Sequence, residues 1–108
     1  AIDPNSSLAL INMGNYYAKG NQPKEAQQWF AKAVQAEPQN PFAHIGLGIQ
    51  SLRLEQMDKA VEHLMQAAAL KPDFVEAYLI LAAIHDRAGR KDDAKKYMAL
   101  ATRFRPAQ

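Results

Sequence analysis

The sequence contains no cysteine. Disulfide bonds, thiolate metal sites and cysteine nucleophiles are therefore excluded, whereas the cellular compartment is left open. An excess of one charge sign is also lacking, because the 13 basic residues are nearly balanced by 11 acidic ones and the formal net charge is only +2. No basic run is combined with the aromatic side chains on which single-stranded nucleic acid stacks. We therefore expect no nucleic acid partner.

Long apolar runs are missing as well. The longest covers residues 77–84, far short of the roughly 20 residues needed to cross a bilayer. The amino terminus has neither the basic nor the apolar region of a signal peptide. The overall composition is that of an ordinary globular protein. With 48% hydrophobic and 22% charged residues, the 108 positions suit one domain with a continuous core. The sequence predicts no membrane partner.

The prolines reveal an internal period. Four of the six recur at an interval of 34 residues, at Pro4, Pro38, Pro72 and Pro106. Three further columns keep this interval and hold only small side chains: Ala26, Ala60 and Ala94; Ala33, Ala67 and Ala101; and Gly14, Gly48 and Ala82. Small residues at fixed helical positions let two helix axes approach closely. The chain is therefore interpreted as a repeat array.

Each unit of the array contains two helical patterns separated by a short break. Leu10, Met13, Gly14 and Tyr17 follow the i, i+3, i+4, i+7 spacing of one helical face. The spacing predicts helices over residues 7–19, 23–36, 41–54, 57–70, 75–88 and 91–103. Proline suits the first turn of a helix, and Gly89 is well placed as a left-handed stop after the fifth helix.

These columns resemble the tetratricopeptide repeat family over residues 7–108. The small residue of the family's first helix matches Gly14, Gly48 and Ala82, and the bulky residue of its second helix matches Phe30, Leu64 and Met98. The family's tryptophan column holds Leu10, His44 and Tyr78, and its aromatic column holds Tyr17, Ser51 and His85. The resemblance implies an all-α solenoid of three helix-turn-helix repeats, at residues 7–40, 41–74 and 75–108, with Phe30 in the core.

The two ends suggest a piece of a longer array. Residues 1–6 align with residues 35–40, and are interpreted as the tail of a preceding repeat or as a cloning remnant. The third repeat is followed by no polar capping helix, which repeat arrays usually need. We therefore expect Leu100 and Phe104 to be partly exposed, and the chain to come from a longer array or to cover its ends by self-association.

The resemblance places ligand binding in a concave groove lined by the first helix of each repeat. Large apolar side chains dominate the middle of the expected groove, and such patches usually mark partner sites. The candidate peptide-binding residues on this face are Leu8, Ile11, Asn15, Phe42, Ile45, Ile49, Leu52, Arg53, Leu79, Ala83 and Arg87. The favoured function is a scaffold that binds an apolar or amphipathic segment of a partner protein.

Three alternatives to this interpretation stay open. Some of the apolar groove residues could pack against the neighbouring repeat instead of facing a ligand. The chain could be a self-assembly module that joins copies through its repeat ends or its groove. It could also be the regulatory arm of a larger enzyme.

One ligand of the family is not expected here. Members that bind the acidic carboxyl terminus of chaperones use a clamp of lysine, asparagine, asparagine, lysine and arginine. The matching positions hold Ile11, Asn15, Gly46, Glu76 and Ile80. Only Asn15 fits, and without the cations a carboxylate would lose its charge-assisted partners.

The chain shows no pattern typical of an enzyme. His44, His63 and His85 lack the i, i+4 spacing that builds metal sites on helices. The paired glycines Gly46 and Gly48 lie inside a helical pattern instead of in a loop after a strand, so they do not indicate a nucleotide site. We expect no catalytic residue, no metal and no cofactor.

Overall fold

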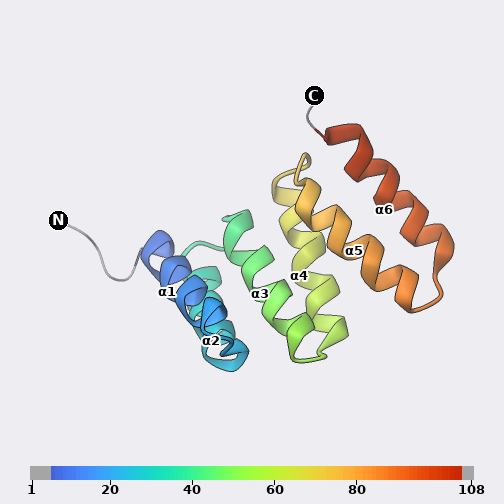
Figure 1. The fold of residues 1–108 in the computed structure, drawn as a ribbon. Coiled ribbons are helices and arrows are strands. Elements are labelled where there is room, and N and C mark those ends of the chain that lie inside the picture. The colour runs from blue at the N-terminus through green and yellow to red at the C-terminus, as the bar shows by residue number, and fades with distance from the viewer. Residues whose placement is uncertain (1–5, 106–108) are drawn as a thin grey trace.

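The computed structural model describes residues 6–105. Within this range the chain forms six helices and no strand: α1 (Ser7–Lys19), α2 (Pro23–Ala36), α3 (Pro41–Arg53), α4 (Met57–Leu70), α5 (Val75–Arg87) and α6 (Lys91–Phe104). The helices follow one another in a row from the amino-terminal to the carboxyl-terminal end (Figure 1). The all-α solenoid is therefore confirmed, while the interpretation of the opening segment falls mostly on residues 1–5, outside the described part.

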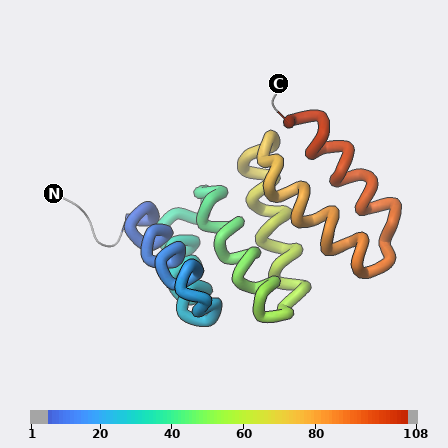
Figure 2. The backbone as a smooth tube through the Cα atoms, in the orientation of Figure 1, coloured from blue at the N-terminus to red at the C-terminus, as the bar shows by residue number. Residues whose placement is uncertain are grey.

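The row consists of three antiparallel helix pairs. In each pair an A helix (α1, α3 or α5) is followed by a B helix (α2, α4 or α6), and each helix contacts the next along the chain (Figure 2). The bounds of α1, α2 and α4 agree with the sequence prediction. The helices α3 and α5 end one residue earlier than predicted and α6 ends one residue later, because the last turn of a helix merges gradually into the following turn.

Side-chain caps explain where two of the three A helices, α1 and α3, begin. The Ser6 hydroxyl accepts a hydrogen bond from the Ala9 amide at 3.2 Å, and Asn40 Oδ1 accepts one from the Phe42 amide at 2.9 Å. Both side chains satisfy amides that have no partner inside the helix. Pro41 then occupies the first turn of α3, where the missing N–H costs nothing.

The turns between A and B helices share one backbone geometry. A left-handed residue occupies the same position of each repeat: Asn21 (φ 58°), Glu55 (φ 60°) and Gly89 (φ 80°). In each turn the next amide donates to a carbonyl of the preceding A helix, at 2.8 to 2.9 Å. The left-handed stop at Gly89 is confirmed. Asn21 and Glu55 adopt the same left-handed conformation, although the sequence predicted it only at Gly89.

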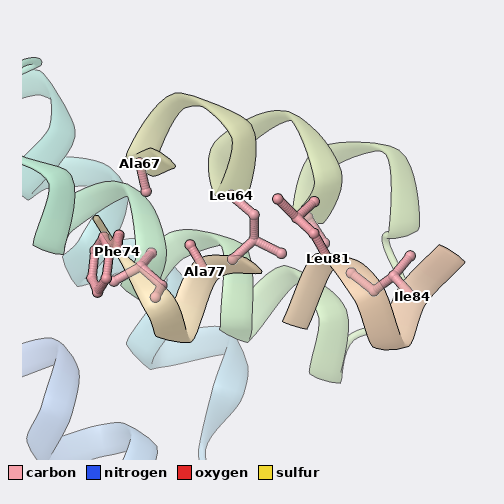
Figure 3. Close-up of a cluster of buried hydrophobic side chains, with 8 residues drawn as sticks. Leu64, Ala67, Phe74, Ala77, Leu81 and Ile84 are labelled. Atoms are coloured by element: carbon pink, nitrogen blue, oxygen red, sulfur yellow. The ribbon is translucent and has the colours of Figure 1, made fainter. Parts of the chain in front are cut away.

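The largest buried cluster joins the second and third repeats. Leu64 and Ala67 of α4 meet Ala77 and Leu81 of α5 (Figure 3). Ile45 of α3 belongs to the same cluster, so three successive helices contribute to it. Leu100 and Phe104, in the last helix, are only half-buried, as the sequence predicted.

Phe30 fixes the distance between the first two repeats. Its side chain is only 2% exposed, which confirms the predicted core position. A Cβ atom added to Gly14 would lie 2.8 Å from the Phe30 ring, and one added to Gly46 would lie closer still. The ring is therefore held between a glycine of its own repeat and a glycine of the next. Neither position has room for a methyl group.

Replacing Gly46 with alanine should destabilise the chain by about 1–3 kcal/mol, because the added methyl group overpacks the Phe30 ring. A smaller side chain in Phe30→Leu should recover part of that loss in the double variant. Urea denaturation measures both values. Gly20→Ala is the matched control, since a Cβ there makes only ordinary contacts of 3.6 Å. Equal losses at Gly20 and Gly46 would contradict the proposed contact.

Glu55→Gly should stabilise the chain by roughly 0.5–1 kcal/mol. A non-glycine residue in the left-handed region costs about 1–2 kcal/mol, and the greater unfolded-state freedom of glycine offsets part of the gain. The reverse change, Gly89→Ala, should destabilise the chain at the corresponding turn. Thermal unfolding measures the two shifts, and an unchanged or lower midpoint for Glu55→Gly would contradict the argument.

Candidate functional site

The A helices form one wall of the molecule, and this wall is hollowed near its amino-terminal end. The hollow, here called the N-terminal cleft, has a volume of about 480 Å³. It lies between α1 and α3 and reaches the first turn of α5. Its lining residues are Leu8, Ile11, Asn12, Asn15, Phe30, Asn40, Phe42, Ile45, Gly46, Ile49 and Glu76. Six of the eleven candidate peptide-binding residues therefore meet in one cleft.

The apolar side chains of the N-terminal cleft differ in how far they reach solvent. Leu8 and Phe42 are exposed, Phe42 by 52% of its surface. Ile11 and Ile49 are half-buried in the wall. The Phe42 ring packs edge-on against Phe74 at a centroid distance of 5.5 Å, so its orientation is supported from one side. An apolar ligand could therefore contact a ring that is already ordered.

Polar groups surround these apolar side chains. The Asn40 side chain caps α3, and its amide also donates to the Ser7 hydroxyl at 3.3 Å, so its role is structural. Asn12, Asn15 and Glu76 are exposed at the cleft. The two amides can donate to and accept from a peptide backbone. The Glu76 carboxylate gives the cleft a negative charge.

The middle of the wall is less exposed than the sequence led us to expect. Ile45 is only 6% exposed and belongs to the buried cluster between α4 and α5. Ile49 and Leu52 pack against the same cluster and are half-buried. The cause is packing against the cluster that α4 and α5 form together. The expectation of an exposed apolar patch across the whole middle A helix is therefore wrong, and Phe42 is its one exposed large member.

The basic candidates end the A helices. The Arg53 guanidinium donates to the Ala18 carbonyl at 3.3 Å and also to the Asn21 side chain. It therefore ties the carboxyl-terminal end of α3 to the turn between α1 and α2. Arg87 lies at the same position one repeat later and is exposed. A positive charge at these sites also favours the negative end of the helix dipole.

Leu79 and Ala83, the remaining candidates, line a different hollow. This C-terminal cleft, of about 350 Å³, lies between α5 and α6. Its lining residues are Leu79, Ala82, Ala83, Asp86, Lys91, Ala94, Lys95 and Met98. The predicted binding residues are thus divided between two clefts instead of forming one continuous surface.

Comparison with known sequences agrees with this architecture. Models described as Tetratricopeptide repeat match residues 7–40, 50–74 and 75–108. The chain belongs to the tetratricopeptide repeat family.

Its curated relatives are much longer proteins. The anaphase-promoting complex subunit CDC16 of Saccharomyces cerevisiae is 29% identical over 83 residues, which cover 74% of this chain and 10% of that protein. The CTR9 homolog of Arabidopsis thaliana is 27% identical over 108 residues, covering 95% of this chain and 10% of that protein. The chain therefore spans about a tenth of the length of these relatives.

Two solved structures show how closely the helices superpose. MamA matches with a TM-score of 0.89 and 25% identity, covering 96% of this chain and 61% of MamA. The first tetratricopeptide domain of Spaghetti (RPAP3), bound to the HSP90 peptide SRMEEVD, also matches with a TM-score of 0.89 and 25% identity. That match covers 99% of this chain and 85% of the Spaghetti chain. The fold is thus one in which a related domain holds a peptide.

A histidine pair lies away from the N-terminal cleft and was not predicted from the sequence. His44 Nδ1 of α3 and His63 Nδ1 of α4 are 3.2 Å apart, and the ring centroids are 5.4 Å apart. The distance between the ring centroids is nearly the sum of the Nδ1–Nδ1 distance and the two distances from centroid to nitrogen. The two nitrogens therefore lie almost on the line between the centroids, and the rings meet edge to edge. The repeat period contained the signal, because Tyr78 and Tyr97 occupy the same two positions one repeat later and also pair.

The backbone assigns the tautomers of this pair. His44 Nε2 lies 2.8 Å from the Pro38 carbonyl, which can only accept, so this nitrogen carries the proton. Tyr78 donates to Pro72 in the same way at 2.7 Å. His44 Nδ1 is then the acceptor and His63 Nδ1 the donor. The pair thus holds one proton between its facing nitrogens, and a second proton there would set two N–H groups against each other.

His85 belongs to no histidine pair within residues 6–105, and its Nδ1 accepts a hydrogen bond from Arg90 Nε at 2.8 Å. His85 stacks on Tyr97 at 5.4 Å, as Tyr17 stacks on Trp29 in the first repeat. Among residues 6–105, side chains of metal-binding types do not gather in groups of three or more. Within the same residues no helix combines the length and apolar character that a bilayer crossing requires.

The His63 side chain should make the stability of the chain depend on pH. Burial, followed by the His44 ring, lowers the pKa of His63 below its usual value of 6.5, and Glu62 and Gln66 oppose this effect. The unfolded chain therefore takes up a proton near pH 6.5 that the folded chain takes up only at lower pH. The free energy of unfolding should fall as the pH drops through 6.5, until the pH reaches the lowered pKa.

The variant His63→Gln should lose this part of the pH dependence. Urea denaturation at several values between about pH 8 and about pH 5, the range in which histidine changes charge, measures the slope. His85→Gln lies outside the pair and should keep the wild-type decline. A His63→Gln chain that declines as steeply as the wild type would contradict the assignment.

Proposed function

We propose that the chain binds an apolar or amphipathic peptide segment of a partner protein in the N-terminal cleft. The observation that supports this most strongly is the combination of exposed Leu8 and Phe42 with the floor formed by the edge of Phe30. Large exposed apolar side chains around a concave surface are typical of peptide sites. Asn12 and Asn15 then supply amides that can pair with the peptide backbone.

The charge at the cleft argues for one kind of segment. Glu76 lines the same cleft as Phe42, and the five positions of the chaperone-tail clamp hold no cation. A carboxylate-ended peptide such as SRMEEVD would therefore meet repulsion without a compensating ion pair. A segment with apolar residues and a basic side chain near Glu76 fits this cleft better.

The relatives support a binding role for the domain. CDC16 is by name a subunit of the anaphase-promoting complex, and the Spaghetti domain holds a peptide. We infer that this chain also contributes a scaffold surface, with Leu8, Ile11, Phe42 and Ile49 as apolar contacts. Asn15, Arg53 and Arg87 remain the candidate polar contacts, with Arg53 already bonded to the turn of the first repeat.

Phe42→Glu should weaken binding of peptides selected from a phage-displayed random library by about tenfold or more. A buried aromatic contact is typically worth at least the 1.4 kcal/mol that corresponds to tenfold. Fluorescence anisotropy of the selected peptides measures the dissociation constant. Phe42 suits this test better than Ile45, because glutamate at the buried Ile45 position would place a charge in the core and unfold the chain.

Met65→Glu is the matched control, because Met65 is an exposed apolar residue of α4 that lies outside both clefts. It should bind the selected peptides as the wild type does. Circular dichroism should show unchanged helicity in both variants. Equal affinities for Phe42→Glu and the wild type would place the binding surface elsewhere.

A further inference from the structure

The C-terminal cleft corresponds to a site that is filled elsewhere in the same molecule. Leu47 of α3 packs against Ala26 and Phe30, with Ile11 against the same cluster. In the third repeat, the positions of Ala26, Phe30 and Ile11 hold Ala94, Met98 and Leu79. All three of these residues line the C-terminal cleft. At the earlier junctions, the A helix of the following repeat packs against the equivalent surface. Within residues 6–105, the C-terminal cleft is therefore the same surface without that helix.

The exposure of one column supports this correspondence. Phe30 and Leu64 are 2% and 0% exposed, because α3 and α5 cover them. Met98, at the same position of the third repeat, is 45% exposed. The difference comes from the absence of a covering helix among residues 6–105. The third repeat thus presents one half of a repeat–repeat interface.

The other half lies on α1. Met13 occupies the position of Leu47 and Leu81, which are both buried, yet it is 37% exposed. Tyr16 occupies the position of Gln50 and Ile84, which are also buried, yet it is 69% exposed. The outer face of α1 therefore carries the side chains that an A helix uses to cover a preceding B helix.

We propose that a second copy of this chain docks head to tail. The α1 helix of one copy packs between α5 and α6 of the other, and Met13 enters the C-terminal cleft beside Ala94 and Met98. The contact continues the packing already present at the junctions between α2 and α3 and between α4 and α5. It buries apolar surface that each copy exposes alone, which is the main driving force for association.

Docking brings one pair of opposite charges together at the edge of this interface. Inside the chain, Arg53 reaches back to the carbonyl of Ala18 in the preceding repeat. Lys19 occupies the position of Arg53 in the first repeat, and Asp86 occupies the position of Ala18 in the third. Docking therefore brings Lys19 of one copy to Asp86 of the other. Asp86 is exposed and bonds Lys91 at 2.7 Å, so Lys19 would share this carboxylate with Lys91, and Lys95 also lines the cleft.

The two faces are different surfaces of the chain, so the contact is heterologous. A dimer formed in this way still has one free C-terminal cleft and one free α1 face. Further copies therefore add at both ends, unless the rotation between successive copies closes a ring. The average mass in solution should therefore rise continuously with concentration. This occupant is independent of the peptide proposed for the N-terminal cleft, because Phe42 takes no part in the interface.

Sedimentation equilibrium of the 108-residue chain tests the proposal. The wild type should exceed its one-chain mass of 12.0 kDa increasingly as concentration rises. Met98→Glu blocks the C-terminal cleft and Met13→Glu blocks the outer face of α1, so each variant alone should remain at the one-chain mass. Mixed in equal amounts, the two variants should form a dimer of twice that mass and nothing larger, since each supplies the face that the other lacks.

Controls separate this inference from the peptide site. Met65→Glu and Phe42→Glu should both associate like the wild type, and circular dichroism should show that every variant is folded. A wild type that keeps one mass at all concentrations would overturn the proposal. So would a Met13→Glu variant that still dimerises while Met98→Glu does not, because that pattern indicates two C-terminal clefts facing each other. A mixture of the two blocked variants that stays monomeric would overturn it too.

Discussion

The close approach of Phe30 to Gly14 and Gly46 determines how the first two repeats stack. The ring comes from a B helix and lies between the A helices of two successive repeats. Leu64 occupies the same position in the second repeat and is fully buried. A bulky side chain on α2 and another on α4 therefore each space two A helices, and the row of helices follows from repeating this contact.

The same contact produces the candidate site. Gly46 has no side chain, so the edge of the Phe30 ring remains at the floor of the N-terminal cleft. Farther along the wall, Ile45 is buried and Leu52 is half-buried against the cluster formed by α4 and α5. In the N-terminal cleft, apolar surface is thus available to a ligand where the small residue Gly46 lies between the helices. Binding and stability in this chain therefore depend on the same spacing, and changes to that spacing affect both.

Much of the fold could be predicted from the sequence, because the period and the helical spacing depend on local residue order. Phe30 in the core, Gly89 at a left-handed turn and the helix bounds to within one residue all followed from that pattern. The left-handed Glu55 did not, because glutamate adopts that conformation only when the flanking helices impose it. The identical backbone hydrogen bonds in the three turns are consistent with this cause.

The candidate site was harder to predict. Helical spacing assigns Ile45 and Phe42 to one face, but it does not say how far α5 covers that face. The cross-repeat bonds of Arg53 and the pairing of His44 with His63 depend on the distance between helices that are separate in the sequence. Aligning the repeats would have paired the histidines, since Tyr78 and Tyr97 hold the same positions. Residue spacing within a single helix could not.

The matched sizes at each junction mean that the repeats are not interchangeable. Phe30 is accommodated by Gly46, whereas the residue at the Gly46 position of the third repeat is Ile80, which packs against the cluster around the smaller Leu64. Deleting the second repeat would press Phe30 against Ile80, and exchanging the repeats would leave a void at one junction and a clash at the other. Although the units share one design and one length, their order along the chain is therefore encoded in side-chain volume. An array that grew by duplication would have had to adjust both sides of every new boundary together.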